Sequence, residues 1–245
     1  MNDAKFNKWF NVFILLGMSV CVILSCIFEC SKPDARVALL VVSSVGALMG
    51  VASTILSANG NILTFLFGFI DVVIFSFILW ESKNPSQFLL HLFYFAPMQV
   101  VGFLTWKKKG ADAKTAVTAQ RIRKASEWLK FIGIFAGVFV LSFAISYFVL
   151  QKSGASFALS KVVLDALVTT ANIVAFSMGA FAYMEQWYLW MIVNLSSVVL
   201  WSMQLIQNPA DGYAIIPLVK YSFYLINGIN GTRIWWKLSA PAKQQ

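Results

Sequence analysis

Long apolar runs dominate the chain, and short polar segments separate them. An α-helix of about 20 residues crosses a hydrocarbon core of about 30 Å, and the runs have this length. Strands of a membrane barrel would instead alternate apolar and polar residues over about ten positions. The pattern predicts an all-α polytopic membrane protein with eight transmembrane helices, at 10–28, 37–57, 62–80, 88–106, 128–150, 162–181, 187–205 and 214–235.

Composition supports the membrane interpretation. Of the 245 residues, 59% are hydrophobic and only 12% are charged, against roughly 45–50% and 25% in a soluble domain. The first run follows Lys5 and Lys8, as in a signal peptide, but it is longer than a signal-peptide core and no small-residue cleavage site follows. We therefore expect it to remain as the first span.

Lysine and arginine concentrate between the fourth and fifth runs. With eight spans, this segment and both termini lie on one side, which then carries 12 basic residues against 5 on the other. Because cytoplasmic loops carry the excess of positive charge, we expect both termini in the cytoplasm of a bacterial cell with the protein in its cytoplasmic (inner) membrane. We expect the segment itself to be a solvated, partly helical connector that touches lipid headgroups. Its basic residues are Lys107, Lys108, Lys109, Lys114, Arg121, Arg123 and Lys124.

Two sequence matches indicate an internal repeat. Residues 64–71 (TFLFGFID) align with residues 187–194 (WYLWMIVN), so that aromatics meet aromatics and Asp71 meets Asn194. Residues 102–106 (GFLTW) and 231–235 (GTRIW) both close a run with G-x-x-x-W. The matches predict two parallel three-helix repeats joined by a connecting helix, because an odd number of connecting spans keeps their orientation. The expected domains are an additional N-terminal helix (1–36), a first repeat (37–106), a basic loop with the connecting helix (107–150) and a second repeat with the C-terminal tail (151–245).

Aromatic and amide side chains share one stripe of the seventh run. Trp187, Trp190 and Asn194 recur at spacings of three and four, which places them on one helical face. An indole face attracts a cation, and an amide both donates and accepts hydrogen bonds. Trp187 begins its span, so an interfacial anchor is the alternative for this residue.

Other polar residues of the spans are further candidates. Asp71 is costly to bury without a partner, and it either attracts a cationic ligand or bonds a neighbouring helix. Gln99 offers an amide from the fourth run, where Pro97 is expected to kink the helix. Lys220 lies near the start of the last run and either snorkels to the interface or has a functional role.

Several function classes find little support in the sequence. The net charge of +9 follows the membrane topology, so we expect no nucleic-acid partner. The sequence has neither a nucleotide-binding G-x-x-x-x-G-K-[ST] motif nor the H-E-x-x-H and G-x-S-x-G motifs of hydrolases, so we expect no enzyme activity, no cofactor and no metal. A retinal-type photosensor or pump that uses Lys220 remains an alternative to a transporter.

The W-x-x-W of Trp187 and Trp190, with Asn194 one turn on, resembles the PnuC family of nicotinamide riboside transporters. The last run resembles the same family through Tyr221, Tyr224, Asn227, Gly228, Gly231 and Trp235. The resemblance covers residues 37–235 and implies the 3+1+3 fold of the SWEET sugar transporters. It implies facilitated diffusion of nicotinamide riboside, by alternating access at a midplane site, with a cytoplasmic riboside kinase acting next in NAD synthesis. A SWEET-like sugar uniporter is the second alternative, and a homo-oligomer is left open. The candidate substrate-binding residues are Trp187, Trp190, Asn194, Tyr224, Asn227, Gln99, Asp71, Phe67 and Tyr221.

Overall fold

The computed structural model describes residues 3–33, 36–81, 85–152, 159–207 and 215–240. Each predicted run overlaps a helix of the described residues, and the ends differ by three residues or fewer except at the start of α1. The elements are α1 (Asp3–Cys30), α2 (Val37–Ala58), α3 (Thr64–Glu81), α4 (Pro85–Leu90), η1 (His91–Phe95), α5 (Ala96–Lys108), α6 (Ala125–Lys152), α7 (Leu159–Ala180), α8 (Gln186–Gln207) and α9 (Ile215–Leu238).

The fourth span is interrupted by a π-helical turn. The turn η1 joins α4 to α5 within one apolar stretch, Gln87–Lys108. Pro97 follows directly, and proline supplies no backbone N–H to the preceding helical turn. A π-turn at this point accommodates the lost bond and supports the expected irregularity at Pro97.

Seven stretches of the described residues are long and apolar enough to cross a membrane. They correspond to the first seven predicted spans. The helix α9 is also long, with 24 residues, but it carries Lys220, Asn227 and Arg233 among its apolar positions. Its apolar character is therefore weaker, and it packs against α8, α1 and α2.

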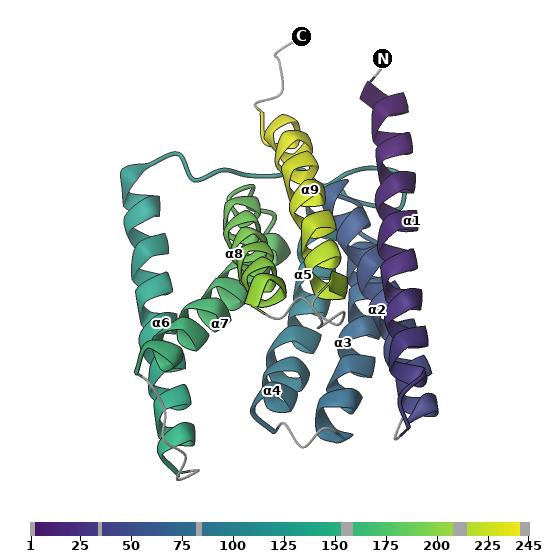
Figure 1. Ribbon diagram of the computed structural model, residues 1–245. Coiled ribbons are helices and arrows are strands. Elements are labelled where there is room, and N and C mark those ends of the chain that lie inside the picture. The colour runs from purple at the N-terminus through teal and green to yellow at the C-terminus, as the bar shows by residue number, and fades with distance from the viewer. Residues whose placement is uncertain (1–2, 34–35, 82–84, 153–158, 208–214, 241–245) are drawn as a thin grey trace.

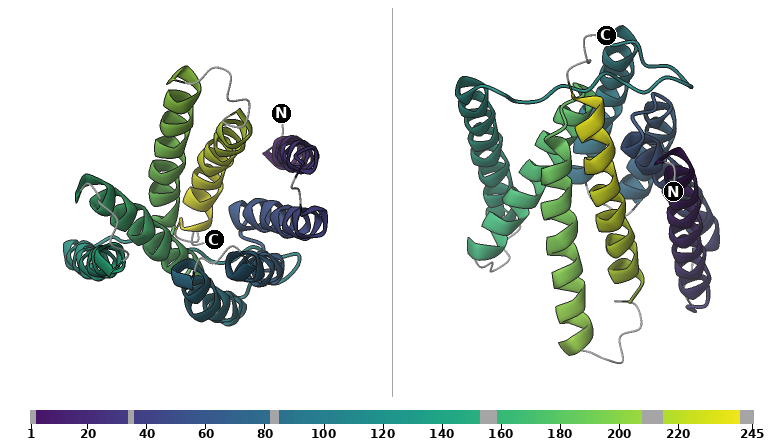
Figure 2. Two further views of the ribbon diagram at one scale, coloured as in Figure 1. Left: turned by 60° about the horizontal axis from the view of Figure 1, so that its bottom comes forward. Right: turned by 90° about the horizontal axis from the view of Figure 1, so that it is seen from above.

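The helices form two groups around the centre of the molecule (Figures 1 and 2). In the first group α3 packs on α2 and on α5, and in the second α8 packs on α7 and on α9. The groups meet where α5 contacts α7 and where α2 contacts α9. The helix α1 lies against α2 and α9, whereas α6 stands at the edge and packs on α7.

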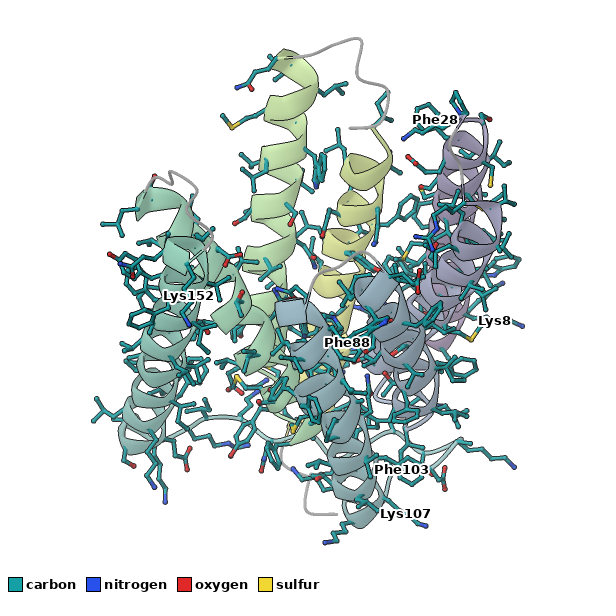
Figure 3. The ribbon with its side chains drawn as sticks, turned by 90° about the horizontal axis from the view of Figure 1, so that it is seen from below. Lys8, Phe28, Phe88, Phe103, Lys107 and Lys152 are labelled. Atoms are coloured by element: carbon teal, nitrogen blue, oxygen red, sulfur yellow. The ribbon has the colours of Figure 1, made fainter. Side chains whose placement is uncertain are left out.

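Apolar side chains cover the outer surface, as a lipid environment requires. Figure 3 shows side chains that fringe the bundle, among them Phe28 and Phe103, which are both exposed. The helix α6 has a single buried residue, Ser142, among those described. Such a helix is stable only where lipid replaces water as its solvent.

The N-terminus, the C-terminal end of α9 and the segment between α5 and α6 lie on the same side of the molecule (Figure 1). We call this side the termini side and residues 109–124 the strap. The expectation of a partly helical strap is wrong, whereas most of its residues are exposed or half-buried, as expected for a solvated segment. The strap has no helix, Val117 is fully buried, and its backbone N–H donates to Gly60 at 2.9 Å. Long-range backbone bonds of this kind leave no periodic signal in the sequence.

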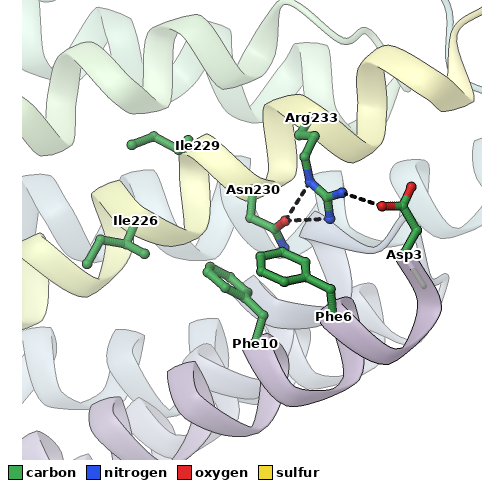
Figure 4. A pocket seen from close by; sticks show the side chains of 7 residues that line it. All are labelled: Asp3, Phe6, Phe10, Ile226, Ile229, Asn230 and Arg233. Carbon is green, nitrogen blue, oxygen red and sulfur yellow. Dashed lines mark hydrogen bonds and ion pairs between the residues drawn. The ribbon is translucent and has the colours of Figure 1, made fainter. Parts of the chain in front are cut away.

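The additional helix α1 is tied to α9 near the termini side. Arg233 donates to Asp3 at 3.2 Å and to Asn230 Oδ1 at 3.0 Å, at the polar end of a groove between the two helices (Figure 4). Phe6 and Phe10 of α1 line the apolar part of this groove. The guanidinium also lies over the Phe6 ring, 4.9 Å from its centroid.

Candidate functional site

A cavity of about 410 Å³ lies between the two helix groups. This volume falls within the range of small-molecule sites, about 300–1,000 Å³. The helices α2, α3 and α5 supply one wall, and α7, α8 and α9 supply the other. The lining residues are Gly50, Ser53, Thr54, Ser57, Thr64, Phe65, Gly68, Asp71, Val72, Gln99, Trp106, Val168, Asn172, Phe176, Gly179, Ala180, Gln186, Trp187, Trp190, Val193, Asn194, Ser197, Tyr221 and Tyr224.

Two indoles and an amide from α8 form part of the second wall. Trp187 is buried, Trp190 is half-buried and Asn194 is buried, and all three line the cavity. Trp187 packs against Gly231 of α9, where a Cβ atom would lie 2.7 Å from the indole. Within the described part of the chain, the Trp187 Nε1 donor has no acceptor. Since Trp187 is buried against α9, it is not the interfacial anchor considered as its alternative.

Asp71 and Gln99 project into the cavity from the first wall. Asp71 Oδ2 lies close to Gly50, where a Cβ atom would be only 2.7 Å away. The Gln99 amide lies equally close to Gly68. Glycine at these two positions makes room for the polar groups between closely packed helices. Asp71 is the only Asp, Glu, Lys or Arg among the lining residues that the structure describes.

Three tryptophans cluster at the end of the cavity that faces the termini side. Trp106 lies in the last turn of α5 and donates through Nε1 to the Gly179 carbonyl of α7 at 2.9 Å. Trp235 lies in the last turn of α9 and donates through Nε1 to the Ser57 carbonyl of α2, also at 2.9 Å. The Trp106 and Trp235 rings lie 5.4 Å apart, and Trp187 lies 6.1 Å from Trp235.

The strap covers this tryptophan cluster from the termini side. Val117 and Met184 are buried in the same apolar core as the tryptophans. Gln120 exchanges backbone hydrogen bonds with Ala182 and Met184, each at 2.9 Å. Ala182 adopts a positive φ of 63°, a conformation uncommon for a residue other than glycine, in the turn between α7 and α8.

Glu185 binds the C-terminal part of the strap at Ile122 and lies outside the membrane spans. Its Oε1 accepts the Ile122 backbone N–H at 2.8 Å, while Oε2 is buried and has no donor in the described residues. Burial disfavours the charged carboxylate and raises the pKa of Glu185 above its ordinary value. The hydrogen bond from Ile122 and the charge of Arg121 act in the opposite direction and offset part of this effect.

Comparison with known proteins identifies the family. A family model described as "Nicotinamide mononucleotide transporter" matches residues 40–237. The chain belongs to this family. The nicotinamide riboside transporter PnuC of Neisseria mucosa is 31% identical over 211 residues, which cover 84% of this chain and 74% of that protein. The PnuC of Haemophilus influenzae is 27% identical over 208 residues, 84% of this chain and 81% of that protein.

The fold is also similar to a solved member. The crystal structure of the vitamin B3 transporter PnuC matches with a TM-score of 0.63 and 26% identity, over 94% of this chain and 91% of that one. The protein is therefore a multi-pass membrane protein of the PnuC family. Its relatives are named transporters, which favours transport over the photosensor and enzyme alternatives.

The cavity of this PnuC-family protein brings together most of the residues proposed from sequence, but not all of them. It is lined by Trp187, Trp190, Asn194, Tyr221, Tyr224, Gln99 and Asp71. The structure places Asn227 outside the lining, fully buried, with Nδ2 donating to the Thr54 carbonyl of α2 at 3.3 Å. Phe67 is half-buried on α3 and also lies outside the lining.

Several polar lining residues escaped the sequence analysis. Ser53, Thr54 and Ser57 follow Gly50 along one face of α2, at helical spacing. This small and polar stripe in an apolar helix is the signal that could have found them. Asn172 of α7 and Gln186 of α8 gave no comparable pattern, because each stands alone among apolar or loop residues.

Two further polar residues of the spans, Asp165 and His91, have structural partners. Asp165 accepts a hydrogen bond from Ser146 at 2.8 Å, which links α7 to α6. His91 Nδ1 lies 2.8 Å from the Gln87 carbonyl, and its ring packs on Phe75 and Phe95. These contacts give both residues a structural role.

Proposed function

We propose that this protein imports nicotinamide riboside by facilitated diffusion, through alternating access at the cavity described above. The observation that carries the proposal is the combination of indoles, amides and a single carboxylate in one cavity of suitable size. Indole faces suit the flat pyridinium ring, with about 0.5–2 kcal/mol for each good cation–π contact. Amides at Asn194 and Gln99 suit the carboxamide and the ribose hydroxyls. The family relatives named for nicotinamide riboside support the choice of solute.

The charge of the cavity favours the riboside over the mononucleotide that the family description names. A phosphate monoester carries about −1.5 to −2 charges at neutral pH and requires basic partners. The described lining has Asp71 and no Lys or Arg. A phosphate next to this carboxylate would be repelled, whereas a pyridinium cation would be attracted.

We propose a 3+1+3 arrangement with eight spans, in which residues 37–106 and 151–245 are the repeats, 107–150 hold the connector and 1–36 form an additional helix. Matching contacts support it. A Cβ atom at Gly102 would overlap the Phe65 ring, as one at Gly231 would meet Trp187. The tryptophan that follows each glycine donates to a helix of the other repeat, Trp106 to Gly179 and Trp235 to Ser57.

The tryptophan cluster also supports alternating access. It closes one end of the cavity through bonds that run between the repeats, so a rocking motion of one repeat against the other would break them. We propose that the closed termini side faces the cytoplasm of a bacterium, since it carries the strap and most of the basic charge. The solute released there would pass to a cytoplasmic riboside kinase.

Uptake into proteoliposomes tests the proposal. We expect saturable flux of labelled nicotinamide riboside down its gradient, without ATP or an ion gradient. Excess unlabelled riboside should compete, and the mononucleotide and glucose should compete far less. Flux that is absent or not saturable would overturn the proposed transport, and equal competition by glucose would favour a sugar uniporter.

A further inference from the structure

Lys220 lies on the tyrosines that line the cavity. Its Nζ is 5.6 Å from the centroid of the Tyr224 ring and 6.0 Å from that of Tyr221. Lys220 is half-buried in the second turn of α9 and does not itself appear in the lining. The ammonium is thus held over two aromatic faces, an arrangement that stabilises a cation when water is partly excluded.

Asp71 lies within electrostatic reach of the same group. The Lys220 ammonium acts electrostatically on the Asp71 carboxylate, and Asp71 in turn acts on the Tyr224 hydroxyl. In the described residues, the Asp71 carboxylate forms neither a hydrogen bond nor an ion pair at direct contact distance. One carboxylate, two phenol rings and one ammonium therefore form a group at the cavity wall.

The charges of this group balance when the cavity is empty. Asp71 contributes one negative charge and Lys220 one positive charge. A pyridinium solute brings a second positive charge to the same carboxylate and the same kind of ring face. Two cations that share one carboxylate repel each other, and the repulsion is large where the effective dielectric constant is about 20 or less.

We propose that Lys220 is an internal competing cation, which neutralises Asp71 and covers the Tyr221 and Tyr224 rings until a cationic solute displaces it. Lys220 is then a specificity-determining residue: it lowers the affinity for cationic solutes and leaves the affinity for neutral solutes unchanged. A weaker complex releases its solute more readily, which suits a carrier. The inference rests on the proposed function, because it takes the pyridinium riboside as the solute.

The experiment compares two ligands of nearly the same shape. Nicotinamide riboside carries the cationic ring, and its dihydro form carries an uncharged ring. Binding is measured by isothermal titration calorimetry on the full-length protein in detergent, with Lys220→Met and with Lys220→Arg as the charge-retaining control. Lys220→Gln replaces Lys220→Met if the methionine variant is not monodisperse.

We expect Lys220→Met to tighten binding of the cationic riboside on the order of tenfold, the factor that corresponds to removing one modest charge repulsion. Binding of the dihydro form should change less than about twofold, and Lys220→Arg, which keeps the positive charge, should not tighten binding of the cationic riboside. When Asp71 is already replaced by Asn, Lys220→Met should increase the affinity for the cationic riboside by less than half of that factor. The reason is that the effect of Lys220 depends on the charge of Asp71.

Two results would overturn the inference while the proposed function stands. In one, the parent protein binds the riboside and Lys220→Met binds it equally well or more weakly. In the other, Lys220→Met increases the affinity for both ligands to the same extent. A parent protein that binds neither ligand overturns the proposed function and the inference together.

Discussion

At the scale of single residues, Trp190 is the cleanest test of the aromatic wall. It lines the cavity and is half-buried, and its other side packs against the apolar core that holds the tryptophan cluster, so the thermal midpoint of the variant is measured together with its affinity. We expect Trp190→Ala to weaken riboside binding about 2- to 30-fold, the range that a lost cation–π contact of about 0.5–2 kcal/mol predicts.

Trp9 provides a matched control for this substitution. It is 61% exposed on α1, away from the lining residues. Trp9→Ala should leave the riboside affinity within about twofold of the parent value, because no cavity contact is lost. An equal effect of the two substitutions in calorimetry would remove Trp190 from the binding site.

The carboxyl of Glu185 makes the stability of the strap dependent on pH. Its folded-state pKa is raised, so folding favours the protonated form. The contribution to stability is therefore complete below the ordinary glutamate pKa of about 4.5 and is lost as the pH rises through the raised value. We expect the thermal midpoint of the parent protein to fall over this interval.

Glu185→Gln keeps an oxygen acceptor for the Ile122 N–H but does not titrate. We expect its thermal midpoint to change less with pH over the same interval than that of the parent protein. Parallel profiles for the two proteins, measured by differential scanning fluorimetry from pH 4 to pH 8, would show that Glu185 does not contribute to this dependence.

At the scale of helices, the contact of α8 with α9 requires a glycine at position 231 but tolerates a methyl group at Gly228. At Gly231 a Cβ atom would lie 2.7 Å from the Trp187 ring, whereas at Gly228 it would meet only Met191 Cγ, at 3.5 Å. We expect Gly231→Ala to cost about 1–3 kcal/mol through overpacking and to weaken riboside binding by displacing Trp187.

Gly228→Ala is the control, since the new methyl group makes an ordinary contact. Alanine in a helix is also favoured over glycine by about 0.5–1 kcal/mol. We expect this variant to unfold at the parent temperature or slightly above it. Equal losses of thermal stability in the two variants would contradict the packing described for α8 and α9.

The helices were predictable from sequence because lipid imposes length and apolar character on each span. The predicted run 37–57 and α2 (Val37–Ala58) differ by one residue, for example. The wall formed by Trp187, Trp190 and Asn194 was predictable for a related reason, since spacings of three and four place residues on one helical face. The strap was not predictable, because backbone bonds such as that of Val117 to Gly60 leave no trace in composition.

The position of Asn227 shows the limit of this reasoning. The face of α9 that carries Tyr224 was correctly assigned to the cavity, but Asn227 is one turn further on and turns toward α2. Helical spacing places residues on a face and does not say which neighbour that face meets. The neighbour was decided by the cross-packing of α2 and α9, which is a property of the assembled bundle.

At the scale of the whole molecule, two indole hydrogen bonds join the two helix groups, and in the proposed alternating-access cycle they keep the termini side closed. Trp106→Phe and Trp235→Phe each remove one indole donor and keep an aromatic ring. A net loss of about 0.5–1.5 kcal/mol for each bond should shift the equilibrium toward the state open on this side by about two- to tenfold.

Thiol accessibility measures this shift. A single cysteine is introduced by Ser53→Cys, at a position that lines the cavity. The native cysteines Cys21, Cys26 and Cys30 are replaced by serine, so that only the new thiol can react. A membrane-impermeant maleimide is applied from the termini side. It should react with this thiol faster in Trp106→Phe or Trp235→Phe than in the protein that keeps both tryptophans. Lys114→Cys, on the exposed part of the strap, should react at one rate throughout. Unchanged labelling of Ser53→Cys in both variants would mean that the bonds do not control access.

The attachment of α6 has a further consequence. This helix packs on α7, and residues such as Leu129, Val140 and Phe148 are exposed on its outer surface, where the bilayer would meet them. In the proposed cycle, a rotation of the second repeat would carry α6 sideways through the bilayer. The viscosity of the membrane would then resist the motion directly, so lipid chain saturation and temperature should influence the turnover rate even where every contact with the solute is unchanged.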